Sequence, residues 1–115
     1  MTTLLAYHSD PKIKTKYLTR LRNHRKADEL VQGEGWVQNG TTKGCAVGCI
    51  LHGPEHRRFE TELGIPVELA YLIDGLFEAL PNGAAKEFPR QFVNAIRPGA
   101  DLSMVIPQFL LWMLS

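Results

Sequence analysis

The stretch IPVELAYLIDGLFEAL, residues 65–80, decides the predicted fold. Its apolar residues recur at the spacing of one helix face: Leu69, Leu72, Ile73, Leu76, Phe77 and Leu80. Pro66 suits the first turn, where its missing N–H is not needed, and Pro81-Asn82-Gly83 is typical of a helix end. The spacing therefore predicts a helix here, in which Asp74 is the acid to test for burial.

The N-terminal part of the chain predicts another helix, ending at Gly33. Ser9 or Asp10 can accept hydrogen bonds from its first N–H groups, and Pro11 suits its first turn. An apolar stripe supports this prediction: Ile13, Tyr17, Leu18, Leu21, His24, Leu30 and Val31. The basic residues mostly fall off this stripe, so we expect them in solvent.

Shorter segments with helical character follow at residues 44–51, 55–64, 85–96 and 102–115. In the last of them, Pro107 should kink or restart the helix. No long run alternates apolar and polar residues, and β-branched residues are scattered. We therefore predict an all-α fold, a compact single-domain bundle of about five helices over residues 1–115. A minor β element near the N-terminus or residues 34–38 would be compatible with this fold.

Length and composition indicate a single soluble domain. The chain has 115 residues, of which 44% are hydrophobic and 22% charged, close to the average of globular domains. Its start, MTTLLAY, lacks the cationic leader of a signal peptide, and its longest apolar stretch, residues 105–114, is far below the ~20 residues that span a bilayer. We expect a cytoplasmic protein that does not bind membranes and whose two cysteines are thiols.

Positive charge is concentrated at the N-terminal end. Residues 1–27 carry seven Lys or Arg and one acid, whereas residues 28–115 carry six Lys or Arg and eleven acids. This split can create a basic face for an anionic macromolecule, or it can dock the first helix on the acidic remainder of the chain. The candidate binding residues are Lys12, Lys16, Arg20, Lys26 and Lys43.

Both cysteines and two of the four histidines lie within TTKGCAVGCILHGPEH, residues 41–56. Cys45, Cys49, His52 and His56 would fall within about 60° of one another on an ideal helix. Eleven residues of helix rise roughly 16 Å, whereas zinc takes ligands at about 2.0–2.3 Å, so a straight helix cannot bring all four to one ion. We expect this stripe to fill space in a packed core, without a cofactor, because Cys is among the most buried residue types.

Two chemical alternatives remain open for this segment. In the first, the candidate zinc ligands are Cys45, Cys49, His52 and His56. Cys45 and Cys49 are spaced i, i+4 on a helix, His56 can fold back beyond Gly53-Pro54, and His24 or His8 can complete the site. In the second, Cys45 is a nucleophile activated in the first turn of a helix, and His24 is the base. Either alternative would make the protein an enzyme.

Several stretches together resemble an uncharacterised family of bacterial and phage-borne hypothetical proteins, among them KGCAVGCILH at residues 43–52 and TELGIPVELAYLIDGLFEALP at residues 61–81. The resemblance covers most of the chain. It implies a prokaryotic or mobile-element setting and carries no established activity. Longer relatives in that family imply that this chain is a shortened form.

The sequence favours a non-catalytic binding module over a thiol- or metal-dependent enzyme. We expect a small helical protein that binds another macromolecule, a protein in the first place and nucleic acid in the second. The basic N-terminal helix and the apolar residues 105–114 are the candidate surfaces, and the latter also suits a homo-oligomer. In a phage setting, the partner could be a host defence protein that the chain inhibits.

Overall fold

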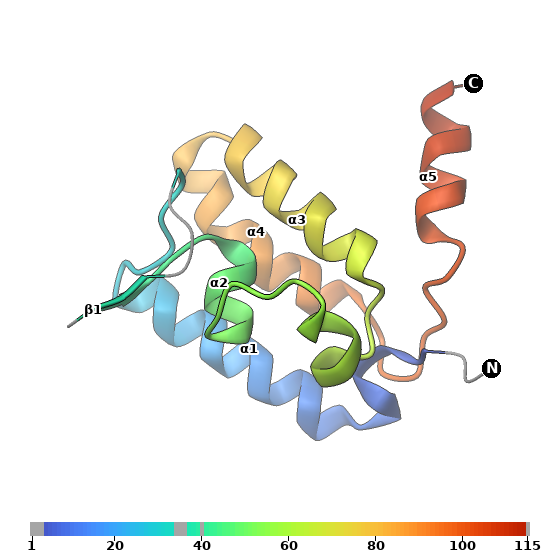
Figure 1. Ribbon diagram of the computed structural model, residues 1–115, viewed down its shortest axis with the longest axis horizontal. Helices are drawn as coiled ribbons and strands as arrows, with labels where there is room; N and C mark the ends of the chain where they lie inside the picture. The colour runs from blue at the N-terminus through green and yellow to red at the C-terminus, as the bar shows by residue number, and fades with distance from the viewer. Residues whose placement is uncertain (1–3, 34–36, 40, 115) are drawn as a thin grey trace.

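The computed structural model of the chain describes residues 4–33, 37–39 and 41–114. Within these ranges the chain forms α1 (Pro11–Lys26), α2 (Ala46–Leu51), α3 (Val67–Ala79), α4 (Asn82–Ala95) and α5 (Val105–Leu114) (Figure 1). Two single turns, η1 (Ala6–Ser9) and η2 (Phe59–Leu63), precede α1 and α3. The prediction of an all-α fold is confirmed.

A short hairpin interrupts the helices between α1 and α2. It pairs β1 (Val37–Asn39) antiparallel with β2 (Thr41–Lys43). This hairpin overlaps the β element predicted at residues 34–38, of which 34–36 lie outside the described residues. The alternative position near the N-terminus is wrong for the described residues 4–9, because they end in the helical turn η1.

Helix α1 starts as predicted but ends early. The Asp10 side chain accepts a hydrogen bond from the Lys12 N–H at 2.9 Å, which caps the first turn. The helix then stops at Lys26 rather than at Gly33, so the predicted end is wrong.

The segment after α1 pairs with a residue far along the chain instead of continuing the helix. Val31 N–H donates to the Gly44 carbonyl, and Gly44 N–H donates to the Glu29 carbonyl, both at 2.9 Å. Leu30 thereby forms a parallel bridge with Gly44. These bonds satisfy the backbone groups outside a helix, and the periodicity of residues 10–33 could not reveal this long-range pairing.

The core lies around α2, which is buried along its whole length. Helix α1 packs along α4, α4 packs against α3, and α2 contacts both α1 and α3 (Figure 1). The largest fully buried side chains are Tyr7, Tyr17, Phe59, Phe77, Leu21, Leu30, Ile50, Leu51, Leu63, Ile65, Ile73 and Val47. Burying each of the large apolar side chains stabilises the fold by about 1.5–3 kcal/mol before the entropy of ordering is subtracted.

The N-terminal turn η1 has an unusual backbone and is tied to the far end of the chain. Tyr7, His8 and Ser9 have φ angles of 55°, 51° and 60°, in the left-handed region that costs a non-glycine residue roughly 1–2 kcal/mol. Tertiary bonds hold this turn in place. The Tyr7 hydroxyl donates to the Val93 carbonyl at 2.6 Å, and Ala6 N–H donates to the Ala100 carbonyl at 2.9 Å.

Helix α5 stands beside the rest of the molecule, as Figure 1 shows. None of its ten residues, all of which the structure describes, is buried. Pro107 lies in its first turn, where no N–H donor is missed, and the helix predicted from residue 102 begins at Val105. In the described ranges, no helix combines the length and hydropathy required to cross a bilayer.

Candidate functional site

Helix α2 separates the four residues that the sequence placed on one stripe. Cys45 is the N-cap, and its sulfur accepts a hydrogen bond from Gly48 N–H at 3.4 Å. Cys49 lies within the helix, and His52 ends it in a left-handed conformation with φ of 55°. His56 lies beyond the helix, in the segment that leads to η2. The stripe is therefore not one continuous helix face.

The first polar cluster surrounds the carboxylate of Asp74 on α3 and is called the Asp74 cluster. His56 Nε2 lies 2.7 Å from Asp74 Oδ2, and Val47 N–H donates to Oδ1 at 3.1 Å. The Cys45 thiol donates to Oδ2 at 3.7 Å. The His56 ring stacks on Tyr71, with centroids 4.4 Å apart. Asp74 and His56 are only 20% and 21% exposed, so this cluster joins α2, α3 and the connecting segment in a largely dry environment.

The environment of the two thiols favours their protonated form. Burial, supported by the Asp74 charge and opposed by the hydrogen bond from Gly48, raises the pKa of Cys45 to about 11. Burial, together with the nearby Cys45 and Glu29, raises the pKa of Cys49 to about 12. Both sulfurs stay protonated at neutral pH, whereas the attacking species would be a thiolate.

A second cluster, the Glu29–His24–His52 chain, lies where α1 meets the end of α2. His24 is 6% exposed, its Nδ1 lies 2.8 Å from Glu29 Oε1, and its Nε2 lies 2.7 Å from His52 Nε2. The two rings are nearly perpendicular, at 86°, with centroids 4.8 Å apart. Because an ionised carboxylate only accepts, Nδ1 of His24 carries a proton, and in the neutral ring Nε2 then accepts from His52.

The environment keeps the outer member of this chain neutral. Partial burial of the imidazole of this otherwise exposed residue, followed by the positive charge of Arg20, lowers the pKa of His52 to about 4. Arg20 is held close by, because its guanidinium donates to the Ile50 carbonyl at 2.7 Å. At neutral pH the imidazole of His52 is therefore uncharged and able to donate from one nitrogen and accept at the other.

The predicted catalytic pair and the predicted metal ligands are divided between these two clusters. The Cys45 thiol is directed to Asp74, while His24, its predicted base, bonds to Glu29 and His52. Across the part of the chain that the structure describes, no group of three or more His, Cys, Asp or Glu is placed to hold a metal ion. The proposed set of Cys45, Cys49, His52 and His56 is thus not assembled.

Two of the predicted binding residues on α1 contact the Tyr17 ring of the protein itself. Arg20 donates to Ile50 and lies over the Tyr17 ring at 5.1 Å, and Lys16 lies over the same ring at 5.3 Å. Lys12, Lys16 and Lys26 are exposed. Lys43 belongs to β2, and its side chain lies outside the described part of the chain.

Two carboxylates, Glu29 and Asp74, organise the two polar clusters. Asp74 had a signal in the sequence, as an acid within an otherwise apolar helix. No sequence pattern pointed to Glu29. Its contact with His24 depends on the early end of α1 and on the hydrogen bond from Gly44 N–H to the Glu29 carbonyl. Its partner His24 was predicted as a packed residue of the apolar stripe and as a possible base, and it is indeed buried.

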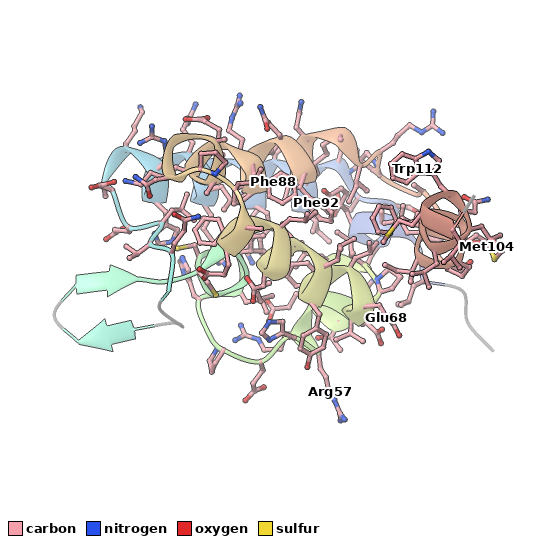
Figure 2. All side chains as sticks on the ribbon, turned by 90° about the horizontal axis from the view of Figure 1, so that it is seen from above. Arg57, Glu68, Phe88, Phe92, Met104 and Trp112 are labelled. Carbon is pink, nitrogen blue, oxygen red and sulfur yellow. The ribbon has the colours of Figure 1, made fainter. Side chains whose placement is uncertain are left out.

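Away from α2, an apolar groove opens between α3, α4 and the start of α5. Its volume is about 390 Å³, and it is lined by Leu69, Phe88, Gln91, Phe92, Ala95, Ile96, Leu102 and Val105. Figure 2 shows Phe88 and Phe92 on α4, and Trp112 apart from them on α5.

No protein-family model, curated protein or solved structure matches the chain.

Proposed function

We propose that this chain is a protein-binding module and that α5 is its binding surface. The observation that carries the proposal is the exposure of α5: Leu111, Trp112 and Leu114 are 69%, 72% and 84% exposed. Leu110 and Met113 on the same helix are each at least half exposed. Soluble proteins rarely expose a contiguous apolar surface of more than a few hundred Å², and larger patches mark interaction sites.

The chemistry of α5 indicates the kind of partner. The helix, VIPQFLLWML, contains no charged residue, so charge pairing cannot provide its specificity. An apolar helix is bound by burial in an apolar groove, and a tryptophan is the side chain that most often dominates such an interface. The partner is therefore a protein with a hydrophobic groove that accepts about three turns of helix.

The basic residues of α1 provide a second, electrostatic contribution. The exposed Lys12 and Lys26 would speed association with an acidic partner more than they would strengthen the complex. The resemblance to phage-borne proteins leads us to expect a cytoplasmic host protein, with inhibition of a defence protein as the outcome of binding. Nucleic acid is the alternative ligand of this basic surface.

The thiol enzyme is the less favoured alternative. The raised pKa of Cys45 and its hydrogen bond to Asp74, rather than to an imidazole, both oppose formation of the thiolate. We therefore place the function on the surface of the molecule and not on α2.

Matched charge substitutions on α5 test the proposal. We would compare the proteins retained from bacterial lysate by the wild type, Leu111→Glu and Gln108→Glu. Both variants add one carboxylate to an exposed position of the same helix, but only Leu111→Glu removes apolar surface. A genuine partner is retained by the wild type and Gln108→Glu and lost with Leu111→Glu, and the dissociation constant of the purified pair rises at least ~10-fold.

Three results would overturn the proposal. The first is a purified complex whose dissociation constant is the same for Leu111→Glu and Gln108→Glu. The second is that no retained protein distinguishes the two variants. The third is light scattering that shows a wild-type dimer dissociated by Leu111→Glu, because a second copy would then occupy α5. Circular dichroism of both variants verifies that the fold is unchanged.

A further inference from the structure

We propose that His24 and His52 form a two-histidine site for a divalent transition-metal ion, with Glu29 orienting His24. The two Nε2 atoms lie 2.7 Å apart and come from different elements, α1 and the C-cap of α2. Figure 1 shows these elements side by side. This site is distinct from α5 and from the Asp74 cluster.

Admitting an ion requires a local rearrangement of the His52 side chain. Imidazole nitrogens bind zinc at about 2.0–2.1 Å, so two of them on a tetrahedral ion are separated by roughly 3.3 Å. The separation of the two Nε2 atoms must therefore grow by about half an ångström, and the ring of His52 must also turn so that both lone pairs meet at the ion instead of pointing along the line between the nitrogens. His52 is exposed at the end of α2 and can move outward, whereas His24 is buried and stays fixed.

The protons balance without any other reactant. With both rings neutral and Nδ1 of His24 bonded to Glu29, His52 is the donor of the 2.7 Å hydrogen bond between the two Nε2 atoms. On binding, that proton leaves Nε2 and His52 takes the tautomer protonated at Nδ1, so both Nε2 lone pairs are directed at the ion. No net proton release is needed, and the Nδ1 proton of His24 stays on its bond to Glu29.

Glu29 supplies the feature that distinguishes this pair from an ordinary histidine contact. Its carboxylate accepts the Nδ1 proton of His24 at 2.8 Å, which directs the Nε2 lone pair of His24 away from Glu29. Metal-bound histidines commonly bond a carboxylate in this way, which fixes the tautomer and raises the basicity of the ligand. The backbone of Glu29 is itself fixed, because its N–H donates to the His24 carbonyl at 2.9 Å.

The donor set indicates the class of metal. Two neutral imidazoles suit copper, nickel or zinc rather than magnesium or calcium, which prefer oxygen ligands. The described residues provide no third His, Cys, Asp or Glu to the group, so water or an incoming ligand takes the remaining positions. The nearby charge of Arg20 offsets that of Glu29 in part, and we expect weaker binding than at closed four-ligand sites.

Copper(II) and zinc(II) are the probes for this site. The full chain, freed of metal with a chelator, is titrated with zinc by calorimetry and with copper by electron paramagnetic resonance. We expect one ion per chain and a copper spectrum with coupling to imidazole nitrogens. His52→Gln should weaken binding at least ~10-fold, and Glu29→Gln should weaken it about 10- to 100-fold.

The controls separate this site from other histidines. His8→Gln removes an exposed imidazole whose Nε2 lies 2.8 Å from the Thr61 carbonyl, and it should leave binding unchanged. His24→Gln lies in the core, so its circular dichroism is measured, but the exposed His52→Gln keeps the test independent of folding. Absence of one-to-one binding, or binding unaffected by His52→Gln, would show that the two histidines form a hydrogen bond only.

Discussion

Asp74 of α3 accepts a hydrogen bond from the Val47 backbone N–H at 3.1 Å, so a carboxylate from one helix caps the start of another. The first N–H groups of a helix have no partner within it, and α2 has no acidic residue in its own first turn. The second oxygen of Asp74 holds His56 at 2.7 Å. A single side chain thereby fixes both ends of the segment that contains α2.

Replacing Asp74 tests this arrangement. Asp74→Asn keeps the shape but removes the charge that the Val47 N–H and His56 face, and hydrogen bonds to charged groups contribute about 1.5–3 kcal/mol. We expect the free energy of unfolding in urea to fall by about 1–2 kcal/mol. Glu68→Gln, an exposed acid of the same helix, is the control and should change it by less than ~0.5 kcal/mol. Equal effects of the two substitutions would contradict the capping role.

The thiols should react slowly in the folded protein. Because the pKa of Cys45 rises from 9.0 to about 11, its thiolate fraction at neutral pH falls about 100-fold. Iodoacetamide labelling followed by mass spectrometry should show a comparable slowing relative to the same chain in denaturant, with Cys49 slower still. A Cys45 that labels as fast in the folded protein as in denaturant would restore the nucleophile interpretation.

Two glycines should respond to alanine in opposite directions. Gly64 has φ of 65°, and a Cβ there would overlap the carbonyl oxygen of Leu5, so Gly64→Ala should lower the free energy of unfolding by about 2 kcal/mol or more. Gly75 lies inside α3 with open space around it, so Gly75→Ala should raise that free energy by roughly 0.5–1 kcal/mol. Thermal unfolding of both variants measures the difference. A Gly64→Ala protein as stable as the wild type would disprove the close contact with Leu5.

Acid should weaken the protein partly through Glu62. Burial opposes its ionisation, but hydrogen bonds from Arg58, at 2.5 Å, and from the Tyr17 hydroxyl, at 2.9 Å, outweigh it and lower the pKa of Glu62 below its ordinary 4.5. The unfolded chain then binds this proton more readily, so the stabilisation is present above pH 4.5 and is lost as pH falls through the folded-state pKa.

The Glu62→Gln variant isolates this contribution. The difference in free energy of unfolding between wild type and variant should be constant above about pH 5 and shrink toward pH 3. Urea denaturation at a series of pH values measures it. A difference that stays the same over the whole range would show that the pKa of Glu62 is not lowered by folding.

The helices were predictable to the extent that local spacing defines them. Leu69, Ile73 and Phe77 repeat at helical intervals and are buried in α3 as expected. The helical segment predicted at residues 55–64 does end at Gly64, which follows η2 in a left-handed conformation. The end of α1 was missed, because its backbone leaves the helix to pair with Gly44, which lies well beyond any local window.

The sequence could predict which residues belong to the candidate site, but not which of them contact one another. The sequence by itself determined an all-α chain, a concentration of Cys and His near α2, and an apolar end that becomes α5. The tertiary structure alone decided that Asp74 contacts His56 and that His24 contacts His52. These contacts join residues 18 and 28 positions apart. Helix periodicity reports which residues share one face, but the packing of one helix against another decides which faces meet.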